Sequence, residues 1–362
     1  MVANRRRTKQ NKKVLIALSG GIDSAVSAVL LLRQGYAVEA AFMKNWSSTA
    51  GLLRNECPWI DDRREALRVA AFLGIPLRTF DFEKEYQERV MEYFFTEYAA
   101  GRTPNPDVMC NKEIKFKLLY EKAMQLGFDF LATGHYAQIK AGKLERSKDE
   151  FKDQTYFIYN LKPEQLQHVL FPIGGYLKSE VRALARKFKL PNAERKESMG
   201  LCFVGKIRLD QFLKQRIKPR PGKIVNAQGK ILGRHDGIYR FTLGQREGLK
   251  IGGSGPYYVT KKELATNTLV VSKEFNDKDL MVSELQISGL NWLAKPAKFP
   301  AKAKARFRHQ QELQDVVLES IPGSAGKQAI NVKFKRLQRA AASGQSVVLY
   351  QGRVCLGGGI IV

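Results

Sequence analysis

A glycine-rich hexamer near the start of the chain has the residue types of a phosphate-binding loop. Ser19-Gly20-Gly21-Ile22-Asp23-Ser24 lies between a short apolar run and a helical pattern. Adjacent glycines allow successive backbone N–H groups to converge, and the start of a helix adds positive dipole character. No GxxxxGK[ST] pattern occurs, so the loop is not of the Walker A type. The alternative is a glycine turn with a Ser or Asp cap and no chemistry.

A second segment joins a thiol to a carboxylate. In residues 103–111 two prolines favour an extended approach, and we expect Asp107 to cap the helix that follows. Cys110 then falls in or near the first turn, where the helix dipole lowers the pKa of a thiol. Without such a shift, only about 3% of a thiol with a pKa of ~8.5 is thiolate at pH 7. A buried structural cysteine beside a capping aspartate fits the same residues, and both interpretations stay open.

A third segment, residues 198–205, contains Cys202 among apolar residues and glycines. Cys202 lies 92 residues after Cys110, and no two of the four cysteines form a CxxC pair. We therefore expect neither a disulfide scaffold nor a metal site. Two isolated thiols together with a phosphate loop favour sulfur chemistry. Packing in a strand core explains Cys202 equally well, and the spacing leaves open whether the two thiols meet.

The overall charge points to a polyanionic partner. The 362 residues include 61 Lys and Arg against 35 Asp and Glu, a formal net charge of +26. Nucleic acid is the first expectation, an acidic membrane surface the second, and an adaptation for solubility the third. No apolar run approaches the ~18–20 residues of a membrane-spanning helix, and the basic N-terminus lacks a secretory apolar segment. We therefore expect a cytoplasmic protein.

The elements that must position these residues alternate between strand and helix up to about residue 205. Apolar runs predict strands at 14–18, 37–43, 77–82 and 128–133, and helical patterns cover 22–32, 61–73 and 111–126. This alternation is typical of an α/β domain with a doubly wound parallel sheet.

The composition and the hydrophobic pattern of the sequence change after about residue 205. Glycine and turn residues become denser, short strands are expected at 257–260 and 268–272, and from about 280 the pattern is antiparallel β. From Asn291 onward, twelve basic residues stand against three acidic ones. A small basic β-barrel is suited to an RNA backbone. We therefore divide the chain into a basic arm (1–13), an α/β domain (14–205), a central domain (206–276) and a basic β-barrel (277–362).

Several longer motifs occur in one order and resemble those of a single family. After the hexamer come FMKNW, TPNPDVMCN, LATGHYA, KDQTYF, SMGLCF, FTLGQREGL and VCLGGGII. In this combination the chain resembles the tRNA-specific 2-thiouridylases, the MnmA family of PP-loop ATP pyrophosphatases, over essentially all of its length after the basic arm. The resemblance implies a PP-loop domain of the adenine nucleotide alpha hydrolase type. It also implies an enzyme that adenylates the 2-oxygen of the wobble uridine in Lys, Glu and Gln tRNAs and replaces it with sulfur from a cysteine persulfide.

The resemblance further implies roles for individual residues. Cys110 would be the nucleophile, Cys202 would bear the persulfide, and Asp107 would hold or deprotonate the base or a sulfur species. The residues implied for ATP are Ala17, Leu18, Ser19, Gly20, Gly21, Ile22, Asp23, Ser24, Met43 and Gly134. Those implied for the target base or the rest of the tRNA are Asn105, Pro106, Asp107, His135, Lys152, Asp153, Gln154, Arg306, Phe307 and Gln345.

The implied cofactors are ATP and Mg²⁺, and the implied partners are tRNA and a persulfide donor, either a cysteine desulfurase or a sulfur-relay protein. A monomer is expected. An iron–sulfur cluster on Cys110, Cys202 and one of Cys57 or Cys355 is not favoured, because nothing in their spacing demands it. Two other classes stay open. A PP-loop ligase that adenylates a carboxylate leaves the two thiols unexplained, and a non-catalytic RNA-binding protein leaves the hexamer unexplained.

Overall fold

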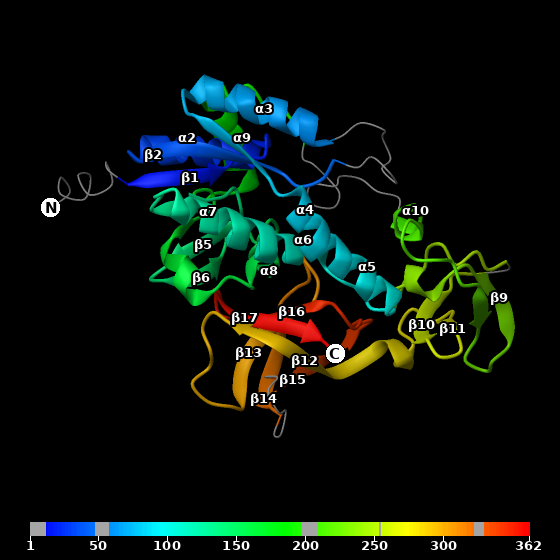
Figure 1. Ribbon diagram of the computed structural model, residues 1–362. Coiled ribbons are helices and arrows are strands. Elements are labelled where there is room, and N and C mark those ends of the chain that lie inside the picture. The colour runs from blue at the N-terminus through cyan, green and yellow to red at the C-terminus, as the bar shows by residue number, and fades with distance from the viewer. Residues whose placement is uncertain (1–11, 48–57, 197–208, 253–254, 322–328) are drawn as a thin grey trace.

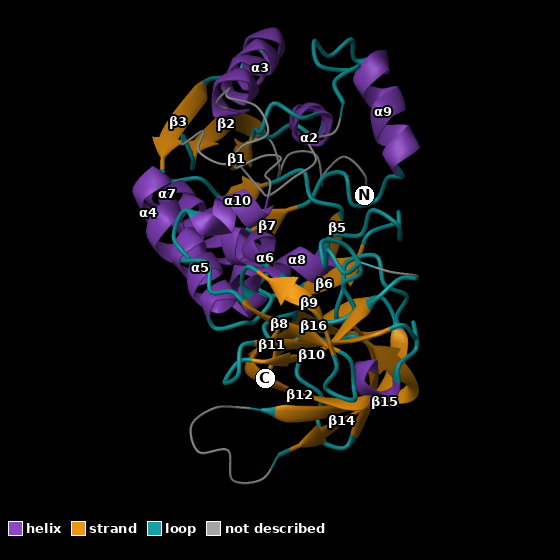
Figure 2. Ribbon diagram, turned by 90° about the vertical axis from the view of Figure 1, so that its right-hand side faces the viewer, coloured by secondary structure: helices purple, strands orange, loops and turns teal. Residues whose placement is uncertain are grey.

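The computed structural model describes residues 12–47, 58–196, 209–252, 255–321 and 329–362. Its strands form a five-stranded sheet covered by helices, a separate four-stranded sheet, and a larger sheet that closes into a barrel (Figure 1). Figure 2 shows α2, α3 and α9 at one end of the molecule and the barrel strands at the other. Within the described ranges, no helix is long and apolar enough to cross a membrane.

The first sheet is parallel and has the strand order β3-β2-β1-β4-β7. Its strands are β1 (Lys13–Ala17), β2 (Ala37–Lys44), β3 (Leu77–Asp81), β4 (Phe130–Ala132) and β7 (Val169–Leu170). In β1, Val14 and Ile16 belong to one hydrophobic core, whereas Leu15 and Ala17 belong to another. The run VLIA is apolar throughout because this strand is buried on both faces.

Helices cover both faces of the sheet. On one side lie α2 (Ile22–Arg33), α3 (Pro58–Leu73) and α9 (Lys178–Lys187). The other side is covered by two helical stretches, namely α4 (Glu83–Tyr86), η1 (Gln87–Met91) and α5 (Glu92–Ala99), followed by α6 (Pro106–Cys110), η2 (Asn111–Leu119) and α7 (Tyr120–Gln125). Both η1 and η2 are π-helical. π-helical turns are rare in proteins, and those that do occur often lie at functional sites.

The predicted α/β sheet is confirmed. The strands and helices expected from the sequence differ from their ranges only at their ends, whereas α9 is a ten-residue helix that the expected ranges do not include. The helix expected at 111–126 begins earlier, at Pro106, and is π-helical in its middle part. The sequence pattern does not predict β7 or the hairpin of β5 (Ala137–Lys140) and β6 (Lys143–Arg146), because two to four residues give no periodic signal. The same holds for the short helices α8 (Thr155–Ile158) and η3 (Pro163–Gln167).

The central part of the chain forms the four-stranded sheet, with the order β10-β11-β8-β9. The elements of this central part are α10 (Leu209–Lys214), β8 (Gly222–Val225), β9 (Ile231–His235), η4 (Ile238–Arg240), β10 (Tyr258–Glu263) and β11 (Thr268–Ser272). Ile224, Phe241 and Val259 are buried in its own small core. Phe212 of α10 instead stacks on Phe95 of α5, so this part of the chain is packed onto the α/β domain.

The C-terminal part is a closed antiparallel barrel, as expected. After η5 (Lys278–Leu280), its six strands are β12 (Met281–Trp292), β13 (Ala301–Arg306), β14 (Gln314–Ser320), β15 (Ile330–Arg339), β16 (Ser346–Gln351) and β17 (Val354–Ile361). They run in the order β12-β15-β14-β13-β16-β17, and pairing of β12 with β17 closes the ring. The hairpin β5–β6 of the first domain continues this sheet beyond β17, at Val354 opposite Glu145.

The barrel and the α/β domain share a hydrophobic core. Val347 and Leu349 of β16 point into the barrel, whereas the alternate residues Val348 and Tyr350 belong to the core beneath the first sheet. Side chains alternate between the two faces of a strand, so the outer face of β16 forms part of the neighbouring domain. A surface of this kind fixes the barrel against the α/β domain.

Candidate active site

The residues expected to bind ATP converge at one edge of the parallel sheet. Ala17 ends β1, and the hexamer connects β1 to α2. Met43 lies near the end of β2, and Gly134 follows β4, the neighbour of β1 on the other side. The strand order reverses at β1, and ligands of open parallel sheets bind at such a point, outside the carboxyl ends of the strands.

The conformation of the hexamer depends on its glycines. Gly20 has φ +77°, and a Cβ there would lie 2.5 Å from the carbonyl oxygen of Asp62. The Gly20 carbonyl accepts a hydrogen bond from the Asn192 side chain at 2.8 Å and another from Arg195 at 3.0 Å. Gly21 is the N-cap of α2, so the first backbone N–H groups of this helix face the ligand side of the loop.

Ser24 closes the loop from inside. Its hydroxyl donates to the Gly21 carbonyl at 3.0 Å and accepts from the Ser19 N–H at 3.2 Å. Gly134 approaches Ser24 so closely that a Cβ at position 134 would lie 2.7 Å from the Ser24 nitrogen. Only glycine fits at position 134, because both parts in contact are backbone.

Lys178 joins the loop although it was not among the predicted residues. Its Nζ lies 2.7 and 2.9 Å from the two carboxylate oxygens of Asp23. The hydroxyl of Tyr136, from the LATGHYA motif, donates to the same carboxylate at 3.1 Å. Lys178 is the first residue of α9, where the helix dipole disfavours a cation. A lysine at the start of a helix is therefore a local signal that an anion lies nearby.

The structure corrects the expected cap of the Cys110 segment. Asn105, not Asp107, is the N-cap of α6, and its side chain accepts a hydrogen bond from the Val108 N–H at 3.2 Å. Pro106 occupies the first helical position, and Asp107 lies half-buried in the first turn. Asp107 and Cys110 are three residues apart on this helix and are therefore neighbours on its surface.

Cys110 ends α6 and is completely buried. It belongs to the same hydrophobic core as Ala17 and Met43, the residues that end β1 and line β2. The candidate nucleophile thus lies in the large core on the face of the sheet opposite to α2, α3 and α9. Cys202 and Cys57 lie outside the described residues, so the pairing of Cys110 with Cys202 stays a prediction.

His135 and Cys355 are both buried. The His135 ring lies 2.7 Å from the Thr133 hydroxyl and packs against Phe116 and Phe171. Burial, aided by the positive charge of Lys115, holds the pKa of His135 well below its usual value, so the ring is neutral at pH 7. Burial also raises the pKa of the Cys355 thiol to about 12.

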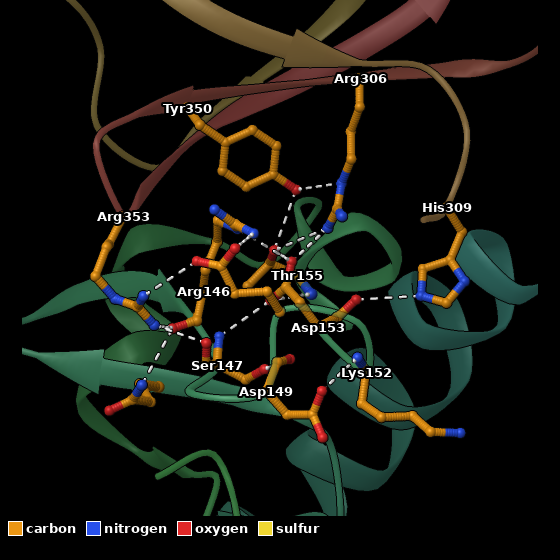
Figure 3. Close-up of polar contacts among 12 residues, drawn as sticks. Arg146, Ser147, Asp149, Lys152, Asp153, Thr155, Arg306, His309, Tyr350 and Arg353 are labelled. Atoms are coloured by element: carbon orange, nitrogen blue, oxygen red, sulfur yellow. Dashed lines mark hydrogen bonds and ion pairs between the residues drawn. The ribbon is translucent and has the colours of Figure 1, made fainter. Parts of the chain in front are cut away.

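Five of the residues expected to contact tRNA lie at the junction of the α/β domain and the barrel. Lys152, Asp153 and Gln154 lie on the loop between β6 and α8, Arg306 ends β13, and Phe307 follows it. Asp153 and Arg306 are buried and form an ion pair, whereas Lys152 points away from them (Figure 3). The Phe307 side chain is buried in the barrel core.

Gln345 lies near the same place. It precedes Ser346, whose carbonyl accepts from the Tyr156 hydroxyl at 3.3 Å, and that hydroxyl also donates to the Phe307 carbonyl at 3.0 Å. The Gln345 side chain accepts from the Ala342 N–H at 3.0 Å. As the structure stands, the side chains of Asp153, Arg306 and Phe307 bind protein.

An exposed basic surface lies on the outside of the barrel. Lys302 and Lys304 of β13 and Lys333 and Lys335 of β15 are exposed and project from the same face of the sheet. Lys304 pairs with Asp315 at 2.9 Å, and Lys333 pairs with Glu319 at 2.9 Å. We call these four lysines the barrel lysines. Their alternation along each strand is what an extended polyanion-binding surface requires.

Three family models match consecutive parts of the chain. They are described as the tRNA methyl transferase HUP domain (residues 12–206), the tRNA methyl transferase PRC-barrel domain (210–273) and the aminomethyltransferase beta-barrel domain (282–361). The tRNA-specific 2-thiouridylase MnmA of Oceanobacillus iheyensis is 45% identical over 98% of this chain and 96% of its own length. The chain belongs to the tRNA-specific 2-thiouridylase family.

Other similarities extend across bacteria. The 2-thiouridylase MnmA of Pseudomonas fluorescens is 44% identical, and the match covers 97% of this chain and 94% of that protein. A solved 4-thiouridine synthetase in complex with RNA and ATP is 21% identical, with a TM-score of 0.39 and coverage of 56% of this chain and 50% of that one. The boundaries of the three family models lie within a few residues of those between the sheets described above.

Proposed function

We propose that this protein is an ATP-dependent tRNA-uridine 2-sulfurtransferase that thiolates the wobble uridine of tRNAs of the Lys, Glu and Gln type. Full-length similarity to the 2-thiouridylases supports the reaction class. The observation that carries the proposal is the phosphate loop at the carboxyl end of β1, where Lys178 and Tyr136 both contact the Asp23 carboxylate. The same domain carries Cys110 on the helix capped by Asn105, so it holds groups for activating an oxygen and a thiol for the attack by sulfur.

The residues at the sheet edge fit ATP. The backbone N–H groups at the N-terminus of α2 and the exposed Ser19 hydroxyl provide donors for phosphate oxygens, and the Ser24 hydroxyl holds the loop in shape. Lys178 adds a positive charge beside Asp23, where the charge of a departing pyrophosphate would need to be neutralised. The uracil 2-oxygen is a very poor leaving group, and adenylation converts it into part of AMP, a good one.

The same loop offers one carboxylate, that of Asp23, to a divalent cation. Mg²⁺ is usually held by one or two carboxylates together with substrate phosphates. Asp23 supplies one carboxylate, and within the described ranges no three His, Cys, Asp or Glu side chains gather to form a metal site. Bound there, Mg²⁺ would neutralise phosphate charge. Asp23 would then exchange its contact with Lys178 for the cation.

Sulfur transfer needs two thiols. In one route the terminal sulfur of a Cys202 persulfide attacks carbon 2 of the activated uracil, AMP leaves, and the Cys110 thiolate attacks the Cys202 sulfur and releases the thiolated base. In the other, Cys110 first releases hydrosulfide from Cys202, and hydrosulfide attacks carbon 2. Both routes end in a Cys110–Cys202 disulfide, which a thiol reductant returns to two thiols. Asp107, a helix neighbour of Cys110, would hold the base or accept a proton.

We further propose that the barrel lysines hold the tRNA backbone and that Lys152 and Gln154 contact it at the domain junction. The exposed charges on β13 and β15 support this role. The sulfur donor would be a cysteine desulfurase or a sulfur-relay protein, which would meet the enzyme in the cytoplasm. The protein would act as a monomer, because one chain carries both the proposed ATP site and the proposed tRNA contacts.

The test is to incubate the protein with ATP, unmodified tRNA and a persulfide donor, and to measure 2-thiouridine and AMP. We expect the two products in equal amounts. Binding of tRNA without AMP formation would indicate a non-catalytic RNA-binding protein. AMP formation that depends on a carboxylate and an ammonia source instead of a persulfide would indicate an adenylating ligase.

A further inference from the structure

The segment that leads into α6 is held by the other two domains of the protein. The Thr103 N–H donates to the carbonyl of Ser343, just before β16, at 2.9 Å. The Thr103 hydroxyl lies 3.1 Å from that of Thr242 in the central domain. Gly344 approaches so closely that a Cβ there would lie 3.0 Å from the Thr103 nitrogen. All three domains therefore meet at Thr103, two residues ahead of the helix cap Asn105.

Lys262 of β10 adds a bridge to this junction. Its Nζ donates to the Gly101 carbonyl at 2.8 Å and to the Phe241 carbonyl at 2.6 Å. Gly101 follows α5 in the α/β domain, whereas Phe241 is buried in the core of the central domain. The register of β10 and β11 shifts between Val259 and Lys261. A bulge of this kind re-aims the side chains that follow it.

The surroundings of Lys262 do not favour a cation. Both acceptors are neutral carbonyls, so the ammonium loses hydration without gaining an opposite charge. Burial accordingly lowers the pKa of Lys262 to about 8. The adjacent Lys261 is exposed. Lys262 itself is half-buried, and its two hydrogen bonds join backbone groups of different domains.

We propose that Lys262 is a positioning residue for the Cys110 segment. By linking the central domain to Gly101, it fixes the start of α6, which carries Asp107 and Cys110. The inference rests on the proposed roles of those two residues in thiolation. The path from Gly101 to α6 is short, so a shift at the junction moves Cys110 relative to the phosphate loop. A misplacement of about 1 Å costs roughly 10²-fold in rate.

The kinetic test compares Lys262→Met, Lys262→Arg and the control Lys261→Met in the full chain, with ATP, tRNA and a persulfide donor. We expect Lys262→Met to lower kcat for 2-thiouridine by about tenfold or more, with KM for ATP changed by less than about twofold. Lys262→Arg, which still donates to both carbonyls, should recover most of kcat. The control should match the parent at saturating tRNA. An unchanged kcat in Lys262→Met, or no recovery with arginine, would overturn the proposal.

A second measurement does not depend on activity. Amide hydrogen exchange of residues 101–110 in the substrate-free protein should be faster in Lys262→Met than in the parent or in Lys261→Met. Equal exchange in the three proteins would refute the bridge whatever the kinetics show. If the parent itself does not thiolate tRNA while the exchange difference is present, the proposed function fails but the bridge from Lys262 to this segment is supported.

Discussion

Asp153 and Arg306, which lie 153 residues apart in the chain, form a buried ion pair that joins the α/β domain to the barrel (Figure 3). Asp153 also accepts from the Thr155 hydroxyl at 2.8 Å and from the Ser147 N–H at 3.1 Å. Arg306 donates to the Tyr350 hydroxyl at 3.1 Å. The side-chain exposures are 0% for Asp153 and 3% for Arg306. The pair therefore holds the loop that carries Lys152 and Gln154 in place, and its charges face each other.

This arrangement predicts different effects for two cations on the same strand. Arg306→Met leaves Asp153 buried without its partner, which should lower the free energy of unfolding by about 3–5 kcal/mol. It should not change the slope of log affinity for tRNA against log salt. Lys302→Met, the exposed control on β13, should leave stability nearly unchanged but reduce that slope by about 0.7–0.9 if it contacts one phosphate. Equal slope changes in the two variants would contradict a purely structural role for Arg306.

The carboxylate and the lysine at the loop should be needed for adenylation alone. Asp23→Ala and Lys178→Met should each reduce AMP formation by about 10²-fold or more, because both act on phosphate charge. Affinity for tRNA should change little, since the barrel lysines lie elsewhere. Pyrophosphate release and filter binding measure the two properties. Normal adenylation in Asp23→Ala would refute the phosphate-loop interpretation.

The close approach of Gly134 to Ser24 gives a steric prediction. Gly134→Ala places a Cβ 2.7 Å from the Ser24 nitrogen and should displace the loop. We expect it to destabilise the protein by about 1–3 kcal/mol and to impair AMP formation. Gly175→Ala is the control, because a Cβ there meets nothing within 4 Å. Thermal unfolding and AMP assays of the two variants should therefore diverge, and similar behaviour would contradict the described packing.

Buried neutral histidines predict a loss of stability in acid. Burial lowers the pKa of His135, His235 and His309 below the ordinary value of 6.5. Below pH 6.5 the unfolded chain binds more protons at these sites than the folded chain, so the free energy of unfolding falls as pH falls. His135→Gln should make the denaturant midpoint less dependent on pH between about 6.5 and 5. An unchanged pH dependence would mean that His135 binds protons equally in the folded and the unfolded protein.

The sequence predicts the local parts of this architecture well. VLIA, two glycines and a helical pattern suffice for β1, the loop and α2, because neighbours in the chain determine them. From the sequence we predict Asp107 as the cap of α6, although Pro106 at the first helical position favours Asn105 as the cap. Residue type did not discriminate, since Asn and Asp both cap helices.

Contacts between distant segments could not be predicted. Lys178 and Asp23 are 155 residues apart. Arg306 continues the alternation of the exposed residues Lys302 and Lys304 on β13, so the strand pattern predicts an exposed arginine. It is buried because the α/β domain covers that end of the strand. Such burial depends on how domains pack, which no local pattern records.

The central claim is that two thiols transfer the sulfur, and single-turnover thiolation of tRNA by the cysteine variants tests it most directly. With ATP and a persulfide donor, Cys202→Ser should form no protein-bound persulfide. Cys110→Ser should adenylate tRNA and release pyrophosphate but release no 2-thiouridine, because a serine hydroxyl is a far weaker nucleophile than a thiolate at neutral pH. Cys355→Ser should retain most activity, and without reductant the parent should accumulate a Cys110–Cys202 disulfide. Thiolation at the parent rate by both Cys110→Ser and Cys202→Ser would contradict the account.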